Sequence, residues 1–118
     1  MNGRATRVSG PGQVANNVWV GHALSVLNAG RAWLYAVVGT NASGAEAYLQ
    51  VFDKASAVTA GDKPLLSLRV PAGDTASLDW SGGRPVNCGL QVAFSQSAGE
   101  FAAPVASGFL IDVCYETF

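Results

Sequence analysis

The side chains able to do acid–base, nucleophilic or metal chemistry are few in this sequence and stand apart from one another. There is one histidine, His22, within the stretch WVGHALS. A nucleophilic site of the Ser-His-Asp or Cys-His kind would have to use it, because the nucleophile needs an adjacent base. The apolar and small neighbours of His22 are more typical of a structural histidine. We therefore predict no catalytic residue and a protein that is not an enzyme.

Metal ligation and phosphate binding need patterns that the sequence lacks. It contains no Cys-x-x-Cys, no His-x-Glu and no Asp-rich calcium loop. The stretch SGGRPVNCG, residues 81–89, has glycines but not the spacing of a phosphate-binding loop, and it predicts a hairpin turn. Asp53, Asp62 and Asp74 fall in or beside expected turns, where aspartate usually bonds to the backbone. We predict no metal and no cofactor; a carboxylate pair assembled by the fold stays open.

Both cysteines lie in apolar runs that predict strands. Cys88 would share a face with Leu90 and Val92, and we expect it to be a small buried residue. Cys114 alternates with apolar neighbours and would share a more polar, solvated face with Asp112 and Glu116. A disulfide between the two cysteines would need a bulge or a partner chain.

Composition favours one domain that is covered in part by other molecules. The chain has 118 residues, a formal net charge of −1 and only 13% charged residues, against about 25% in typical soluble domains. The seven cationic residues are scattered, so nucleic-acid binding through phosphates is not expected. The N-terminus lacks the apolar core of a signal peptide, and runs such as WLYAVVG are too short to span a bilayer. We expect synthesis in a cytoplasm, no membrane partner and self-association.

Seven or so short apolar runs alternate with clusters of Gly, Pro, Asn and Asp. Where the alternation can be tested it has period two: Leu66, Leu68 and Val70 point one way, and Ser67 and Arg69 the other. This pattern predicts an all-β fold, an antiparallel β-sandwich of about seven to eight strands. A jelly roll and an immunoglobulin-like order both stay open.

The first residues and one central strand are the predicted contact regions. Residues 1–17 are rich in Gly, Asn and Ser and predict an extended N-terminal arm, leaving residues 18–118 as the β-sandwich domain. The arm is either frayed or docks on a neighbour through Arg4 and Arg7. In WLYAVV neither face is polar, so either a covering segment or an intersubunit contact through Trp33 and Tyr35 is expected.

The aromatic residues allow one further function class. Exposed aromatic rings can stack on sugars, so they could line a carbohydrate-binding face. Most of them lie within apolar runs, which favours core or interface positions instead. The residues concerned are Trp19, Trp33, Trp80, Tyr35, Tyr48 and Tyr115.

Residues 31–116 resemble the small β-sandwich structural proteins of tailed bacteriophages. The resemblance rests on short motifs that are built from structural residue types. They are the Gly39-Thr40-Asn41-x-Ser43 stretch, the strand from Tyr48 to Asp53, the turn from Gly61 to Pro64, the Pro71-Ala72-Gly73 strand end, the run from Cys88 to Phe101, and the closing FLIDVCYE. The shorter middle part and the N-terminal arm depart from the pattern.

The resemblance implies a non-enzymatic virion component. We expect a capsid decoration or cement protein on the capsid exterior, which binds the major capsid protein or other virion proteins. A homo-oligomer is implied, with a trimer preferred because shells offer three-fold positions. The alternatives are a tail or baseplate component and a carbohydrate-binding module on the virion surface.

Overall fold

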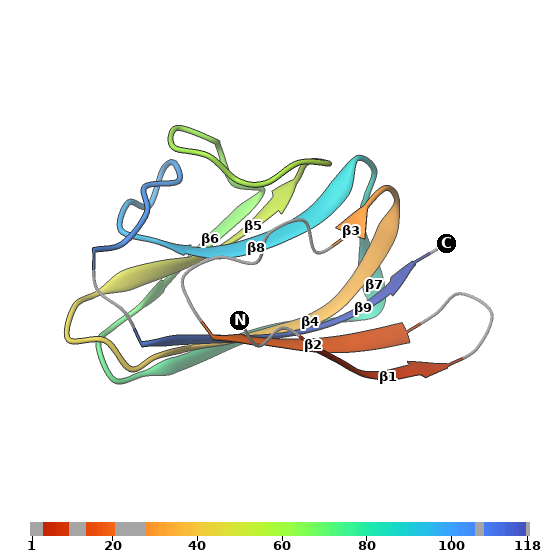
Figure 1. The fold of residues 1–118 in the computed structure, drawn as a ribbon, viewed down its shortest axis with the longest axis horizontal. Helices are drawn as coiled ribbons and strands as arrows, with labels where there is room; N and C mark the ends of the chain where they lie inside the picture. Colours follow the sequence, from red (N-terminus) through yellow and green to blue (C-terminus); the bar gives the residue numbers. More distant parts are fainter. Residues whose placement is uncertain (1–3, 10–13, 21–27, 106–107, 118) are drawn as a thin grey trace.

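A computed structural model describes residues 4–9, 14–20, 28–105 and 108–117, with side chains for residues 30–105 and 108–116. The described residues form nine β-strands and no helix (Figure 1). The strands are β1 Arg4–Ser9, β2 Val14–Val20, β3 Asn28–Ala29, β4 Ala32–Asn41, β5 Ala47–Asp53, β6 Leu66–Val70, β7 Thr75–Val86, β8 Gly89–Ser95 and β9 Phe109–Thr117. The expected all-β class is confirmed. No helix in these ranges is long and apolar enough to cross a membrane.

The strands form two antiparallel sheets. The six strands with described side chains give one sheet in the order β9-β4-β7 and another in the order β8-β5-β6. The backbone of β1 and β2 extends the first sheet to β1-β2-β9-β4-β7, and β3 extends the second to β3-β8-β5-β6. The expected count of seven to eight strands is not met, because β1 and the two-residue β3 were not anticipated as strands.

The core lies between the two sheets and draws on β4 to β9. Its alternation is regular on β9, where Phe109, Ile111 and Val113 are buried. The rings of Phe94 and Phe109 stack with centroids 4.6 Å apart. Gly39 leaves room for this packing, since a Cβ there would lie 2.8 Å from the Phe94 ring. A larger residue at Gly39 would push the sheets apart locally.

Strand β7 continues through the glycine-rich part of the predicted turn. Leu34 pairs with Arg84 and Ala36 with Asp79, so β7 carries extra residues opposite Tyr35. The hairpin turn predicted within residues 81–89 is confirmed only at its end, since the change of direction occurs at residues 87–88. The glycine-rich residues 81–83 instead belong to a bulge within the strand. A bulge absorbs glycines without ending the ladder, so the turn begins later than the glycines indicate.

The outer face of the four-stranded sheet is covered by two loops of the chain itself, residues 54–65 and 96–104. Phe52 and Ala93 on the sheet pack with Phe101 and Val58 from the loops. The rings of Phe52 and Phe101 meet edge to face, with centroids 6.2 Å apart. Backbone bonds join the loops: the Gly61 N–H donates to the Phe101 carbonyl at 2.9 Å. This layer forms a second, smaller apolar cluster.

Two buried glutamines fasten these loops to the sheet. The Gln50 amide nitrogen donates to the carbonyl oxygens of Ser97 at 2.8 Å and Ala98 at 3.3 Å. The Gln91 amide nitrogen donates to the Lys54 carbonyl at 3.2 Å. Both glutamine side chains are fully buried. Nothing in the strand pattern distinguished them from solvated polar positions.

The segment expected to be an extended arm takes part in the sheet. Val14 to Val20 pair with β9 along seven register positions, and Arg4 pairs with Val18. The expected boundary after residue 17 therefore falls inside β2. A ladder satisfies backbone N–H and C=O groups whatever the side chains are, so the Gly, Asn and Ser content did not prevent strand formation.

Candidate interaction surface

Trp33 and Tyr35 lie together on the outer face of the five-stranded sheet. By outer face we mean the side chains of β4, β7 and β9 that point away from the core. Trp33 pairs with Pro85, and Tyr35 sits opposite the β7 bulge. Gly83 has a φ of +83°, and a Cβ there would lie 3.0 Å from the Tyr35 ring and 3.2 Å from that of Trp33. Both rings therefore pack closely against the backbone of the bulge.

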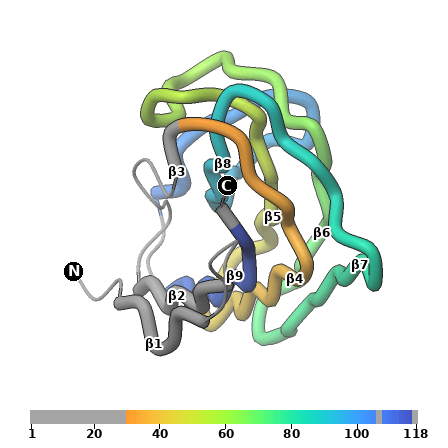
Figure 2. Tube along the Cα trace, turned by 90° about the vertical axis from the view of Figure 1, so that its right-hand side faces the viewer, coloured from red at the N-terminus to blue at the C-terminus, as the bar shows by residue number. Residues whose placement is uncertain are grey.

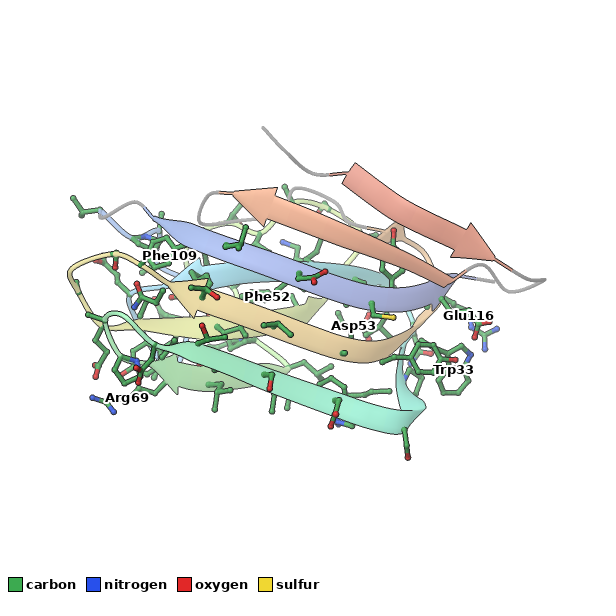
Figure 3. All side chains as sticks on the ribbon, turned by 90° about the horizontal axis from the view of Figure 1, so that it is seen from below. Trp33, Phe52, Asp53, Arg69, Phe109 and Glu116 are labelled. Atoms are coloured by element: carbon green, nitrogen blue, oxygen red, sulfur yellow. The ribbon has the colours of Figure 1, made fainter. Side chains whose placement is uncertain are left out.

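Tyr35 is held in place by β9. Its hydroxyl donates to Oε1 of Glu116 at 2.7 Å. The hydrogen bond to Glu116, with burial and the negative charge of that carboxylate as smaller causes, raises the pKa of Tyr35 above its usual value. The phenol stays protonated and serves as a positioned donor, not as a base. Figure 3 shows Trp33 and Glu116 at the same end of the sheet.

The rest of this face is a mixture of apolar and acidic side chains. Leu110 is 40% exposed, Val38 is half-buried and Asp112 is exposed. Cys114 is half-buried there, as its strand parity predicted, and it is a free thiol. Burial, with the nearby charge of Asp112, raises the pKa of the Cys114 thiol. A thiol held protonated is a poor nucleophile.

The other predicted contact residues lie away from the aromatic pair. Arg4 and Arg7 belong to β1, which two strands separate from β4 in the sheet. Their side chains lie outside the described residues, as does His22. The structure therefore brings together two of the four predicted contact residues. It adds Gly83 and Glu116, of which only Glu116 had a sequence signal, through its alternation with Val113 and Tyr115.

Cys88 is exposed, which corrects the expectation that it is a buried residue. It sits in the turn after β7, one residue before β8 begins at Gly89, so the alternation of strand faces does not apply to it. This turn is fixed by Asp53, whose carboxylate accepts backbone N–H bonds from Asn87 at 3.1 Å, Cys88 at 2.8 Å and Gly89 at 3.2 Å. Burial alone would raise the Asp53 pKa, but these three donors together hold it below its usual value.

The carboxylate of Asp62 likewise accepts hydrogen bonds, from a backbone N–H and from a lysine. Its Oδ2 accepts a bond from Lys54 at 2.6 Å and one from the Thr59 N–H at 2.8 Å. The Lys54 hydrogen bond, followed by that from Thr59, lowers the Asp62 pKa. Both aspartates thus hold turns, as their place in the sequence predicted. The parts of the chain that the structure describes contain no group of three or more residues that could hold a metal ion.

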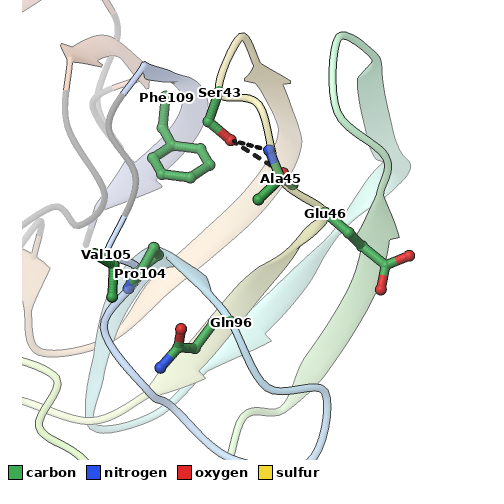
Figure 4. A pocket seen from close by; sticks show the side chains of 7 residues that line it. All are labelled: Ser43, Ala45, Glu46, Gln96, Pro104, Val105 and Phe109. Carbon is green, nitrogen blue, oxygen red and sulfur yellow. Dashed lines mark hydrogen bonds between the residues drawn. The ribbon is translucent and has the colours of Figure 1, made fainter.

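One pocket of about 280 Å³ lies at the end of the sheets near the start of β9. Its walls are mostly apolar, and Figure 4 shows the Glu46 carboxylate directed away from Phe109. The Ser43 hydroxyl is used locally, donating to Asn41 at 2.6 Å. Polar groups do not converge on the pocket, so it offers little to orient a substrate. The lining residues are Ser43, Ala45, Glu46, Gln96, Pro104, Val105 and Phe109.

Comparison with known proteins does not assign the chain to a family. No protein-family model matches the chain, and no curated protein matches it.

Proposed function

We propose that the chain is a non-enzymatic structural protein of a tailed-phage virion, a capsid decoration or cement protein on the outside of the head. It would stabilise the head through contacts with the major capsid protein. The proposal begins from the sequence resemblance over residues 31–116. The observation that carries it further is the order of the strands.

The strand order supports a jelly roll over an immunoglobulin-like sandwich. From β2 to β9 the chain changes sheet at every connection except that between β5 and β6, so that β2-β9-β4-β7 faces β3-β8-β5-β6. In such an order the two sheets follow from one long hairpin wound upon itself, with β2 beside β9 and β3 beside β8. This arrangement is typical of viral capsid and lectin domains. In this interpretation β1 is an addition to one edge.

The outer face of the five-stranded sheet supports a docking role. Trp33 and Tyr35 form its most aromatic part, and tryptophan and tyrosine are the residues most often central to protein interfaces. The low charge content of the chain suits a protein that is partly covered by a shell. Binding only to the assembled lattice would add to shell stability by mass action. Contacts repeated over the lattice, if copies are joined, would add avidity.

A binding assay tests the proposal. Heads that lack this protein, prepared from the phage whose genome encodes it, would be mixed with the purified chain and sedimented. We expect saturable binding, weakened about tenfold or more by Trp33→Ala, because truncating an aromatic anchor commonly costs that much. Leu65→Ala, which alters another exposed apolar residue near β6, is the matched control and should bind normally.

Other results would favour the alternatives. Binding to purified tails and not to heads would assign the chain to a tail or baseplate position. Binding to a glycan that competes at Trp33 would favour the carbohydrate-binding module, which the lectin-like strand order also allows. No binding to any of these would overturn the virion role. The trimer expected from the sequence stays a prediction, and the mass of the chain in solution distinguishes it from a monomer or a dimer.

A further inference from the structure

The edge of β7 differs from the other three strand edges of the molecule. An open edge presents unpaired N–H and C=O groups, and proteins usually shield it with short length, charge, proline or a bulge. Strand β3 has only two residues. Strand β6 has five and lies between Pro64 and Pro71. Strand β1 has a register break between Ala5 and Val8.

Strand β7 is the long edge and is regular over its first half. Residues Thr75 to Asp79 pair with β4 without interruption, and the bulge and Pro85 come only afterwards. On its other side β7 has no neighbouring strand within the described residues. Between Thr75 and Trp80 there is neither proline nor lysine, and the one charged residue is Asp79. This half of the edge carries the least protection against pairing with another strand.

The core side of this edge is also incompletely closed. Ala76 and Trp80 pack against the main core yet stay half-buried, and Leu78 between them is half-buried too. On the inner strands the equivalent residues, such as Val37 opposite Leu78, are fully buried. Figure 2 shows β6 and β7 together at one side of the molecule. An additional strand beside β7 would cover these three side chains.

We propose that the occupant is β7 of a second copy of the chain, paired antiparallel about a two-fold axis at Leu78. In this register Leu78 lies opposite Leu78 of the other copy, and Ala76 lies opposite Trp80. The half-buried side chains of the two copies then cover one another. On the outer face, Ser77 lies opposite Asp79, where a hydroxyl can donate to the carboxylate. The contact does not depend on the proposed virion role.

Charge selects this register over its neighbours. Residues that face each other across an antiparallel ladder must point to the same side, so a two-fold axis passes through a residue pair. An axis at Asp79 would set two carboxylates directly opposite each other, which is unfavourable. An axis at Ser77 would set Trp80 opposite Asp74. Only the axis at Leu78 pairs the apolar positions with each other and keeps the aspartates apart.

This register predicts that two charged substitutions at Ser77, an exposed residue, change the stability of the dimer in opposite directions. Ser77→Asp would place two like-charged pairs against Asp79 of the other copy, and Ser77→Lys would place two opposite-charged pairs there. Each cross-strand charge pair changes affinity modestly. The dimer dissociation constant should rise roughly two- to thirtyfold in Ser77→Asp and fall by a similar factor in Ser77→Lys. Ser56→Asp and Ser56→Lys, at an exposed loop serine, are the controls and should leave it unchanged.

The full-length chain would be studied by sedimentation velocity over a wide concentration range at low salt, with thermal unfolding used to check that each variant is folded. A reversible dimer with opposite responses to the two Ser77 substitutions supports the proposal. Slower hydrogen exchange of the Thr75–Trp80 amides at high concentration would support it independently. A monomer at all concentrations, a trimer, or a dimer indifferent to Ser77 would overturn it. None of these outcomes decides whether the chain binds phage heads.

Discussion

The outer face of the four-stranded sheet lies beneath the chain's own loops, whereas that of the five-stranded sheet carries Trp33 and Tyr35 with no described loop passing below it in Figure 1. The polarity of the outward-facing side chains does not explain why one face is covered and the other is open. Gln50 is buried on the covered face, and Leu110 is 40% exposed on the open one. The difference between the two faces is therefore one of covering: each carries both apolar and polar side chains, but within the described residues only the four-stranded sheet has loops of the chain packed on it.

The largest loss of folding stability is expected from Phe101→Ala, on the covered face. Phe101 is 5% exposed and joins both loops to Phe52, so its removal leaves a cavity in the second cluster. We expect a loss of about 3 kcal/mol in the free energy of unfolding, measured by urea denaturation. Leu110→Ala on the open face is the comparison and should cost well under about 1 kcal/mol. Equal losses would mean that the two faces are covered to the same extent.

Gln50→Ala should cause the next largest loss of stability, and its effect should be confined to the loop that Gln50 binds. It removes the donor that two loop carbonyls share, leaving those oxygens to find water or stay unpaired. The expected loss is about 1–3 kcal/mol, with faster amide hydrogen exchange in residues 96–104. Gln96→Ala, at the exposed glutamine that begins this loop segment, is the matched control. Unchanged exchange in Gln50→Ala would show that the aromatic cluster alone holds the loops.

A third change probes the turn between the sheets. The folded-state pKa of Asp53 lies below its ordinary value of 3.8, so its ionised form stabilises the fold. That contribution is present above about pH 4 and is lost as pH falls through the lowered pKa. Asp53→Asn should therefore cost about 1 kcal/mol at neutral pH and progressively less as the pH falls below 3.8. Urea denaturation across a series of acidic and neutral pH values checks it, with Asp112→Asn as control; a pH-independent loss would contradict the charge-based explanation.

The sequence predicted the inner faces better than the outer ones for a physical reason. Burial between two sheets imposes period two, so Leu66, Leu68 and Val70 could be assigned to one face without coordinates. Asp53 was also assigned correctly, because a short carboxylate beside a turn usually finds backbone N–H groups. What covers an outer face depends on loops that fold back over many residues. No local pattern marks Gln50 as buried.

The remaining differences have similar causes. Glycines in residues 81–83 were interpreted as a turn, but in a bulge they let Trp33 and Tyr35 approach the backbone. Cys88 was assigned to a buried strand position, but β8 begins one residue later, at Gly89. Residues 1–17 were expected to be an arm since their composition cannot build a core, but residues 4–9 form β1. Pairing with β2 needs only backbone groups.

The smallest effect on stability is expected from Tyr35→Phe on the open face. It removes one hydrogen bond, to Glu116, and leaves the ring on Gly83, so the free energy of unfolding should fall only slightly. Since the folded-state pKa of Tyr35 is raised above 10.0, the stabilisation by its hydroxyl is present below pH 10 and is lost as pH rises through that higher value. Titration of tyrosine ring carbons by NMR measures the shift in the Tyr35 pKa directly.

Glu116→Gln should lower the Tyr35 pKa toward its ordinary value, because the charge that opposes ionisation is gone. An unchanged pKa would mean that Glu116 does not position the ring. If Tyr35→Phe barely alters stability yet weakens binding to heads, the open face is kept for contact and not for folding, which is the distinction between the two faces in its strongest form.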